Sequence, residues 1–203
     1  MDPRPFPPRE LQPGDGPPLT VRTLGLDDAE AWAAHVREDL ARLSVHLGWP
    51  ARTASPEGAR GFLGPYARRE DGRELLLGAF DDDAGGRLVA GALLMRHDPE
   101  HGAVELGCWA VAAAEGRGIV RRLCLLALEH AHEALGAHRV LWEAAADNHR
   151  SRALAQRLGF RFEGRLREAV LHDGRRLDID LLSLVGPELP RALAGSAQPA
   201  GAP

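Results

Sequence analysis

The stretch "AVAAAEGRGIVRRLCLLALEHAHEALGAHRV" (residues 110–140) decides the fold, because it joins a strand to a long helix through a glycine turn. Gly116, Arg117 and Gly118 form that turn. The helix pattern that follows is apolar almost all round and continues until Gly136 ends it. Such a helix is expected to be buried on more than one side, so it holds its N-terminus rigidly in place.

Two interpretations of this turn stay open. A helix N-terminus carries unpaired N–H groups and a partial positive charge, and phosphate binds there when the backbone can come close. Gly116 and Gly118 lack the Cβ atoms that would block this approach, and Arg117, Arg121 and Arg122 add positive charge. A pyrophosphate fits this description, and the alternative is a tight turn without a ligand. Neither the Gly-Lys-Ser/Thr of a Walker loop nor the three glycines of a dinucleotide-binding fingerprint is found here.

The pattern on either side of the turn predicts a mixed sheet. Strands are expected at 19–24, 74–80, 87–97, 103–111 and 138–145, followed by a hairpin over 160–185 that turns at Asp173-Gly174. Helices are expected from Asp27 or Asp28 to 45, over 55–69, from Gly118 to 135 and over 148–158. Consecutive strands favour antiparallel pairs, and the strand–helix–strand unit at 103–145 favours one parallel pair. We therefore expect an α/β (α+β) fold with a mixed, mostly antiparallel seven-stranded sheet and helices on both faces.

Composition limits the domain organisation and the class of protein. The 203 residues are 44% hydrophobic, which is enough for one domain with a real core. We expect a tail at 1–18, which contains seven prolines and should be extended or disordered, a folded unit at 19–186 and a flexible tail at 187–203. The net charge of −4 gives no global basic field for nucleic acid.

The sequence also argues against membrane and metal sites. It has no run of 18 apolar residues and no apolar segment near its start, so neither a membrane span nor a secretory signal is expected, and we place the protein in the cytoplasm. Cys108 and Cys124 lie in apolar runs and are expected to be buried free thiols. No metal site is predicted, because the spacing of a zinc site would need more ligands.

Several motifs at matching spacing resemble the GNAT acyltransferase superfamily. More narrowly, the chain resembles the branch that N-acetylates ribosomal proteins at their N-termini. The resemblance is strong over about 105–184 and weaker over 46–63. Its motifs are Gly107-Cys108-Trp109, Gly116-Arg117-Gly118-Ile119-Val120, Asn148-His149-Arg150-Ser151, Leu158-Gly159-Phe160, Glu163-Gly164, and Asp173-Gly174 with Asp178.

Two positions depart from the family pattern. Glu115 stands where Gln or Arg is usual, and Arg121 stands where this branch often has Thr or Ser. A carboxylate at 115 would repel a pyrophosphate unless it points away. These differences bear on the phosphate contacts and on which acyl-CoA is preferred.

The resemblance implies an N-acyltransferase that moves an acetyl group from acetyl-CoA, its co-substrate, to a primary amine by direct attack in a ternary complex. The acceptor would be a protein N-terminus, a ribosomal protein or a small amine, and homodimers are common in the family. The strand at 103–111 would splay from its neighbour to admit the pantetheine arm. The cofactor-binding residues would be Trp109, Ala110 and Val111, then Gly116, Arg117, Gly118, Ile119, Val120 and Arg121, and then Asn148 and Ser151.

Two residues are candidates for catalysis. Glu105 is the first candidate for the general base, with Glu143 on the next strand as a second and a salt-bridged or edge-exposed glutamate as the alternative. Ser151 could hydrogen-bond the departing sulfur, and Asn148 either contacts the cofactor or caps its own helix. Arg152 is a weaker candidate for an adenosine phosphate.

Other functions remain open. The first is a non-catalytic domain that binds CoA as a sensor or partner module. The second is an acyltransferase that uses succinyl-CoA, with an arginine to neutralise the extra carboxylate. The third is a structural domain whose glycine turn holds no ligand.

Overall fold

One eight-stranded sheet runs through the whole molecule. The computed structural model describes residues 6–11, 16–68 and 73–195. The strand order is β1-β2-β3-β4-β5-β6-β8-β7, and β5/β6 is the one parallel pair among the described strands. The strands are β1 (Arg9–Leu11), β2 (Leu19–Thr23), β3 (Leu75–Asp81), β4 (Arg87–Asp98), β5 (Ala103–Ala110), β6 (Arg139–Ala145), β7 (Arg161–His172) and β8 (Arg175–Val185). The expected mixed, mostly antiparallel sheet is confirmed, with one strand more than predicted.

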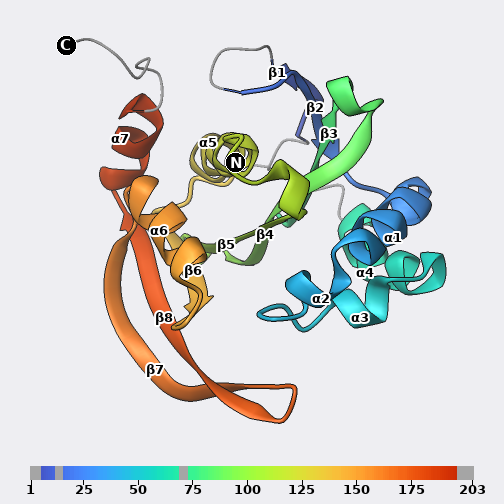
Figure 1. Ribbon diagram of the computed structural model, residues 1–203. Coiled ribbons are helices and arrows are strands. Elements are labelled where there is room, and N and C mark those ends of the chain that lie inside the picture. The colour runs from blue at the N-terminus through green and yellow to red at the C-terminus, as the bar shows by residue number, and fades with distance from the viewer. Residues whose placement is uncertain (1–5, 12–15, 69–72, 196–203) are drawn as a thin grey trace.

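Helices cover both faces of the sheet, as the sequence predicted (Figure 1). One face carries α1 (Ala29–Glu38), α2 (Leu40–Leu43), α3 (Pro50–Thr53) and α4 (Pro56–Ala67). The other carries α5 (Ile119–Glu133), α6 (His149–Arg157) and α7 (Glu188–Gly195). Short 3₁₀ turns lie at η1 (Leu26–Asp28), η2 (Asp82–Ala84) and η3 (Ala112–Ala114).

Local signals explain most helix boundaries. Ser55 caps α4 by accepting a hydrogen bond from the Gly58 N–H, and Pro56 occupies the first helical position. The single helix expected up to residue 45 is instead broken, because Asp39 has non-helical backbone angles (φ −137°, ψ 30°) between α1 and α2. This break frees the Asp39 side chain for contacts with β5 and its following turn.

The ends of the chain contain more structure than the sequence indicated. In the segment expected to be an extended or disordered tail, β1 pairs with β2 and Phe6 is buried in the main core. In the segment expected to be a flexible tail, α7 buries Leu189 in the same core. A few apolar side chains are enough to fix these segments on the sheet. Residues 1–5, 12–15 and 196–203 of the two tails lie outside the described part of the chain.

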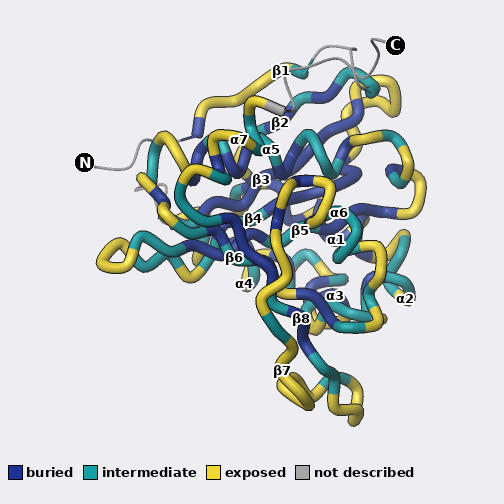
Figure 2. The backbone as a smooth tube through the Cα atoms, turned by 90° about the vertical axis from the view of Figure 1, so that its left-hand side faces the viewer, coloured by how far each residue is buried: buried dark blue, intermediate teal, exposed yellow. Residues whose placement is uncertain are grey.

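Two hydrophobic clusters fill the space on either side of the sheet. The buried parts of the backbone run through the middle of the molecule (Figure 2). The larger lies under α5, α6 and α7 and includes Leu123 and Trp142. The smaller lies under α1 and α4, where Trp32 contacts Phe62 and Trp109 at ring-centroid distances of 5.0 and 5.1 Å. As expected, α5 is buried on several sides. It therefore forms a rigid mount for the glycine turn that precedes it.

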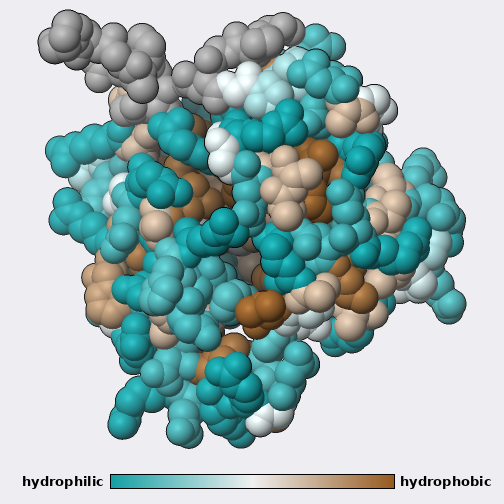
Figure 3. All heavy atoms as spheres, in the orientation of Figure 1, coloured by the Kyte–Doolittle hydropathy of each residue, from teal (hydrophilic) through white to brown (hydrophobic). Residues whose placement is uncertain are grey.

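The sheet opens in the middle, between β5 and β6. These strands pair at Ala103↔Arg139, Val104↔Val140 and Glu105↔Leu141, and the ladder stops there. Beyond that point β5 continues along β4 to Ala110, while β6 continues along β8 to Ala145. The two strands therefore splay apart and leave a gap in the sheet (Figure 1). In the same orientation, the molecular surface is hollowed near its centre, and apolar atoms lie beneath a hydrophilic rim (Figure 3).

Candidate functional site

The glycine turn opens backbone N–H groups at the start of α5. Gly116 and Gly118 have φ values of +71° and +73°, which is the left-handed region that glycine adopts without strain. Gly118 is the N-cap of α5, and no side chain caps the helix there. The first-turn amides, with their partial positive charge, therefore have no side-chain cap.

The arginines around the turn differ from one another. Arg117 Nη1 lies 2.6 Å from Oδ2 of Asp81, a buried carboxylate on β3, so this guanidinium is committed to the sheet. Arg122 donates to the Pro17 carbonyl at 2.5 Å. Arg121 makes no ion pair with any residue that the structure describes. Of the three cations predicted to assist a pyrophosphate, Arg121 is available, whereas Arg117 and Arg122 are held by other partners.

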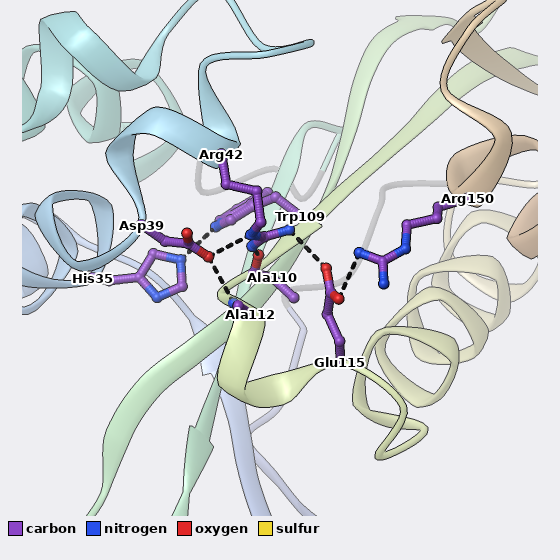
Figure 4. A network of polar contacts seen from close by, with 8 residues as sticks. All are labelled: His35, Asp39, Arg42, Trp109, Ala110, Ala112, Glu115 and Arg150. Carbon is purple, nitrogen blue, oxygen red and sulfur yellow. Dashed lines mark hydrogen bonds and ion pairs between the residues drawn. The ribbon is translucent and has the colours of Figure 1, made fainter.

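Glu115, the departure from the family pattern, is held between two arginines (Figure 4). Its Oε1 lies 2.7 Å from Nη1 of Arg42 on α2, and its Oε2 lies 2.6 Å from Nη1 of Arg150 on α6. Two guanidinium groups surround this carboxylate, and because Arg42 also pairs with Asp39, the four side chains together carry no net charge. The repulsion expected between Glu115 and a phosphate is therefore offset by these neighbours.

Residues between α1 and α2 reach the end of β5. Asp39 Oδ2 accepts a hydrogen bond from the Ala112 N–H at 2.7 Å and another from Arg42 Nε at 2.5 Å. Arg42 also donates through Nη2 to the Ala110 carbonyl oxygen. In this structure Arg42 thus takes one of the backbone groups that the resemblance assigned to the pantetheine arm.

The backbone of β5 presents alternate residues to the gap. The Val111 N–H donates to the Val89 carbonyl at 3.0 Å, so it belongs to the ladder with β4. Since backbone groups alternate along an antiparallel strand, Trp109 also faces β4, whereas Cys108 and Ala110 face the gap. Of the three residues predicted to pair with the cofactor arm, Ala110 points into the gap with its backbone groups.

Trp109 makes a polar contact near the gap through its side chain and not through its backbone. Its indole N–H donates to Nε2 of His35 on α1 at 3.0 Å, and His35 Nδ1 lies 2.9 Å from the Leu88 carbonyl oxygen. An indole nitrogen is a donor alone, so these bonds assign His35 as neutral, with its proton on Nδ1. Burial lowers the pKa of His35, in agreement with that assignment.

Glu105 lies on β5 facing the α1–α4 side and is 6% exposed. The guanidinium of Arg96 on β4 contacts its carboxylate and lies 3.3 Å from Oε2 of Glu143 on β6. Burial, and then the nearby charge of Glu143, raise the pKa of Glu105 to about 7, although Arg96 opposes this shift. Glu105 is thus salt-bridged, which is the alternative interpretation, and its role as general base stays a prediction.

Ser151 is fixed from two directions at the start of α6. Asn148 Oδ1 accepts a hydrogen bond from the Ser151 N–H at 3.1 Å, which is the helix-capping alternative weighed for Asn148. The Ser151 hydroxyl oxygen accepts from the indole N–H of Trp142 on β6 at 2.9 Å. Arg152 is turned elsewhere, because its Nε lies 2.9 Å from Oδ2 of the fully buried Asp180.

Several residues of the site were not found by sequence reasoning, namely Asp39, Arg42, Arg96 and Trp142. Arg42 lies 68 residues from Ala110 and 73 from Glu115 along the chain, so no local pattern links them. Asp39 offers one weak signal, since an aspartate in the middle of an apolar helix pattern is typical of a break.

Other site chemistries find less support. Cys108 and Cys124 are free thiols, as expected, but only Cys124 is buried, and Cys108 is partly exposed. Within residues 6–11, 16–68 and 73–195, no group of three or more His, Cys, Asp or Glu side chains is placed to hold a metal ion. No helix in this part of the chain is both long and apolar enough to cross a bilayer.

Comparison with known proteins identifies the family. The family profile "Acetyltransferase (GNAT) domain" matches residues 18–161. "Putative ribosomal N-acetyltransferase YdaF" of Bacillus subtilis (strain 168) is 30% identical over 169 residues, which are 82% of this chain and 91% of that protein.

Solved structures share the fold. RimJ of Mycobacterium smegmatis, in complex with CoA-disulfide, has a TM-score of 0.78 and 24% identity, with 97% of each chain covered. A GCN5-related N-acetyltransferase from Brucella melitensis has a TM-score of 0.75 and 25% identity over 96% of this chain and 86% of that chain. The profile match over most of the chain and the identity to YdaF show that this protein belongs to the GNAT acetyltransferase family.

Proposed function

We propose that this acetyltransferase moves the acetyl group of acetyl-CoA to the α-amino group of a protein N-terminus, with ribosomal proteins as the acceptor class. The relative in Bacillus subtilis is named for ribosomal N-acetylation. The observation that carries the proposal is the position and the pKa of Glu105, which lies buried on the strand that borders the gap and provides a proton acceptor for the amine.

The gap suits a CoA-thioester donor. The splayed strands offer backbone groups of β5 along one wall, and the uncapped start of α5 offers amides to the diphosphate at the open end. Arg121 is available as a further cation. Because Arg42 holds the Ala110 carbonyl, donor binding along this part of β5 requires Arg42 to release that oxygen.

An α-amine is easier to deprotonate than a lysine side chain, whichever group is the base. An α-amino group has a pKa of about 8 and a lysine side chain one of about 10.4. With the pKa of Glu105 at about 7, moving a proton from the acceptor ammonium costs about 1.4 kcal/mol for an N-terminus and about 4.6 kcal/mol for lysine. The difference of about 3 kcal/mol corresponds to more than a hundredfold in the amount of reactive amine.

Each polar group then has one task in a direct transfer. Glu105, directly or through water, takes the proton of the acceptor amine. A gap-facing N–H of β5, such as that of Ala110, stabilises the carbonyl oxygen as it gains charge. Ser151 hydrogen-bonds the sulfur while the C–N bond forms and the C–S bond breaks.

Release of CoA thiol from acetyl-CoA measures this activity. The acceptors are a peptide with a free α-amine, the same peptide with that amine blocked and one lysine added, and a small primary amine. We expect the free α-amine to react fastest, and succinyl-CoA to react more slowly than acetyl-CoA. CoA binding by calorimetry without thiol release from any acceptor would favour the non-catalytic alternative.

The pH dependence of kcat/KM tests Glu105 itself. The carboxylate is the active form, so the rate should rise with pH and level off above about 7, and Glu105→Gln should lose this inflection together with about 10²–10⁴-fold in rate. Glu163→Gln is the matched control: its pKa is lowered to about 2, chiefly by hydrogen bonds from Arg139 and then Ser183, so its charge does not change in this range. An unaltered profile in Glu105→Gln would move the role of base to another group.

A further inference from the structure

A buried tryptophan on the β6 wall of the gap controls the hydrogen bonding of Ser151. Trp142 is 2% exposed and lies edge-on to Phe160, with ring centroids 5.4 Å apart at an interplanar angle of 67°. Its N–H reaches the Ser151 hydroxyl oxygen at 2.9 Å. The side chain that receives this bond is part-buried at the start of α6.

The direction of this bond decides what Ser151 can do. An indole nitrogen has one proton and no accepting lone pair, so the Ser151 oxygen is the acceptor. The hydroxyl proton must then point away from Trp142. Among the described residues no acceptor for that proton is found, although a serine in a helix often donates to the carbonyl four residues earlier. The O–H is therefore left to donate to a substrate.

We propose that Trp142 is a positioning residue for acetyl transfer: its N–H holds Ser151 so that the hydroxyl donates to the CoA sulfur as the sulfur leaves. This inference rests on the proposed function and adds a residue to it. The serine backbone is already fixed by the Asn148 cap, so the indole removes the remaining rotational freedom of the hydroxyl group.

The electron and proton balance of the step is simple. Glu105 takes one proton from the acceptor ammonium, and the neutral amine nitrogen forms the new C–N bond. The C–S electrons leave with sulfur as a thiolate, which then receives the second proton that the nitrogen loses, so that CoA departs as the thiol. Ser151 keeps its own proton and shares it with the thiolate in a charge-assisted hydrogen bond. Donation from the indole to the serine oxygen polarises the O–H and strengthens that bond, because linked hydrogen bonds are cooperative.

A double-mutant cycle of Trp142→Phe and Ser151→Ala tests the coupling. We expect Ser151→Ala to lower kcat about tenfold. Trp142→Phe should lower kcat about three- to tenfold with little change in the KM for acetyl-CoA, and it should have no further effect in the Ser151→Ala background. Trp32→Phe is the matched control, since this equally buried indole has no hydrogen-bond partner among the residues that the structure describes and should leave kcat unchanged.

The outcomes separate the two proposals. Equal losses from Trp142→Phe with and without the serine hydroxyl would show a packing role and overturn the inference, while wild-type turnover would leave the proposed function intact. Absence of wild-type thiol release with every acceptor would reject both. Should Trp142→Phe fold poorly, Trp142→His retains an N–H for Ser151; activity as low as that of Ser151→Ala in a folded Trp142→His protein would also count against the positioning role.

Discussion

The two strands that border the gap each carry a buried tryptophan whose indole N–H donates a hydrogen bond, but the two series of hydrogen bonds end differently. On β5, the buried indole of Trp109 donates a hydrogen bond to His35, and the Nδ1–H of His35 donates a hydrogen bond to the Leu88 carbonyl. On β6, the buried indole of Trp142 donates to Ser151, whose hydroxyl proton has no acceptor among the described residues. The first chain of hydrogen bonds is closed by the protein, and the second ends at a group that can still donate.

This difference teaches how one residue type serves two purposes. A buried network in which every donor is satisfied makes the surrounding structure rigid, and here it ties α1 to β4 and β5. A network with one donor left over places that donor at a defined point and in a defined direction. The hydrogen bonds of Trp109 and His35 should therefore affect stability, whereas the bond from Trp142 to Ser151 should affect turnover.

Substitution at Gly118 should produce the largest effect, and it should separate CoA binding from turnover. Val at a φ of +73° is strained, and its side chain would stand among the amides that we assign to the diphosphate. We expect Gly118→Val to raise the Kd for CoA at least tenfold, measured by calorimetry. Ser151→Ala should do the reverse, with kcat lowered and Kd nearly unchanged.

A second glycine of the same helix separates strain from ligand binding. Gly136, just beyond the end of α5, also has a left-handed φ of +62° and has open space around it. Gly136→Val should lower the unfolding temperature about as much as Gly118→Val and leave Kd unchanged. Equal Kd values for wild type and a folded Gly118→Val protein would remove the phosphate role from the turn.

The parts that the sequence predicted well depend on local rules. The turn at Asp173-Gly174 was placed correctly because both residues have positive φ (+47° and +76°), which this dipeptide tolerates. The glycine turn before α5 and the cap at Asn148 were likewise found from a few adjacent residues. Glu105 was identified from its position on an interior strand next to the gap.

The parts that were missed depend on contacts between distant segments. Arg117 was expected to help bind a phosphate, but its guanidinium pairs with a buried carboxylate on β3. The two partners of Glu115 come from α2 and α6, and Arg96 reaches Glu105 through an irregular position in β4, where its own φ is +52°. Such pairings follow from how the strands and helices pack, and nothing in the neighbouring sequence specifies them.

Acid should disrupt the hydrogen bonds that run from Trp109 through His35 to Leu88, and it should leave the bond from Trp142 to Ser151 unaffected. The pKa of His35 is lowered in the folded protein, chiefly by burial, so the unfolded chain binds more protons below its usual value of about 6.5. The free energy of unfolding should be unaffected by this group above pH 6.5. It should decrease as the pH falls from about 6.5 toward the pKa of the folded state, by up to about 1.4 kcal/mol for each pH unit.

Urea unfolding of wild type and His35→Gln at several pH values checks this expectation. A glutamine can accept from Trp109 and donate to Leu88 but does not titrate, so the difference between the two proteins should shrink or reverse in acid. Trp142→Phe should shift stability equally at every pH. Parallel pH profiles for wild type and His35→Gln would mean that His35 is not the neutral acceptor that its bonds indicate.

The ion pair that joins the two walls should have the smallest effect. Glu115 follows β5 and Arg150 lies on α6, and the Arg150 side chain is 77% exposed, so its pairing is worth at most about 1 kcal/mol. Arg150→Gln should therefore change the unfolding free energy little.

Arg150→Gln also removes one of the two cations that offset Glu115, so CoA should bind a few-fold more weakly at low ionic strength. At 1 M salt the difference should vanish, because screening then acts within about 3 Å. Arg175→Gln on β8 removes the same charge from an exposed side chain that makes no ion pair with Glu115 in the described structure, and it is the control. An effect of equal size in both variants would mean that the CoA polyanion senses net charge alone, and that the bridge across the gap has no part in receiving it.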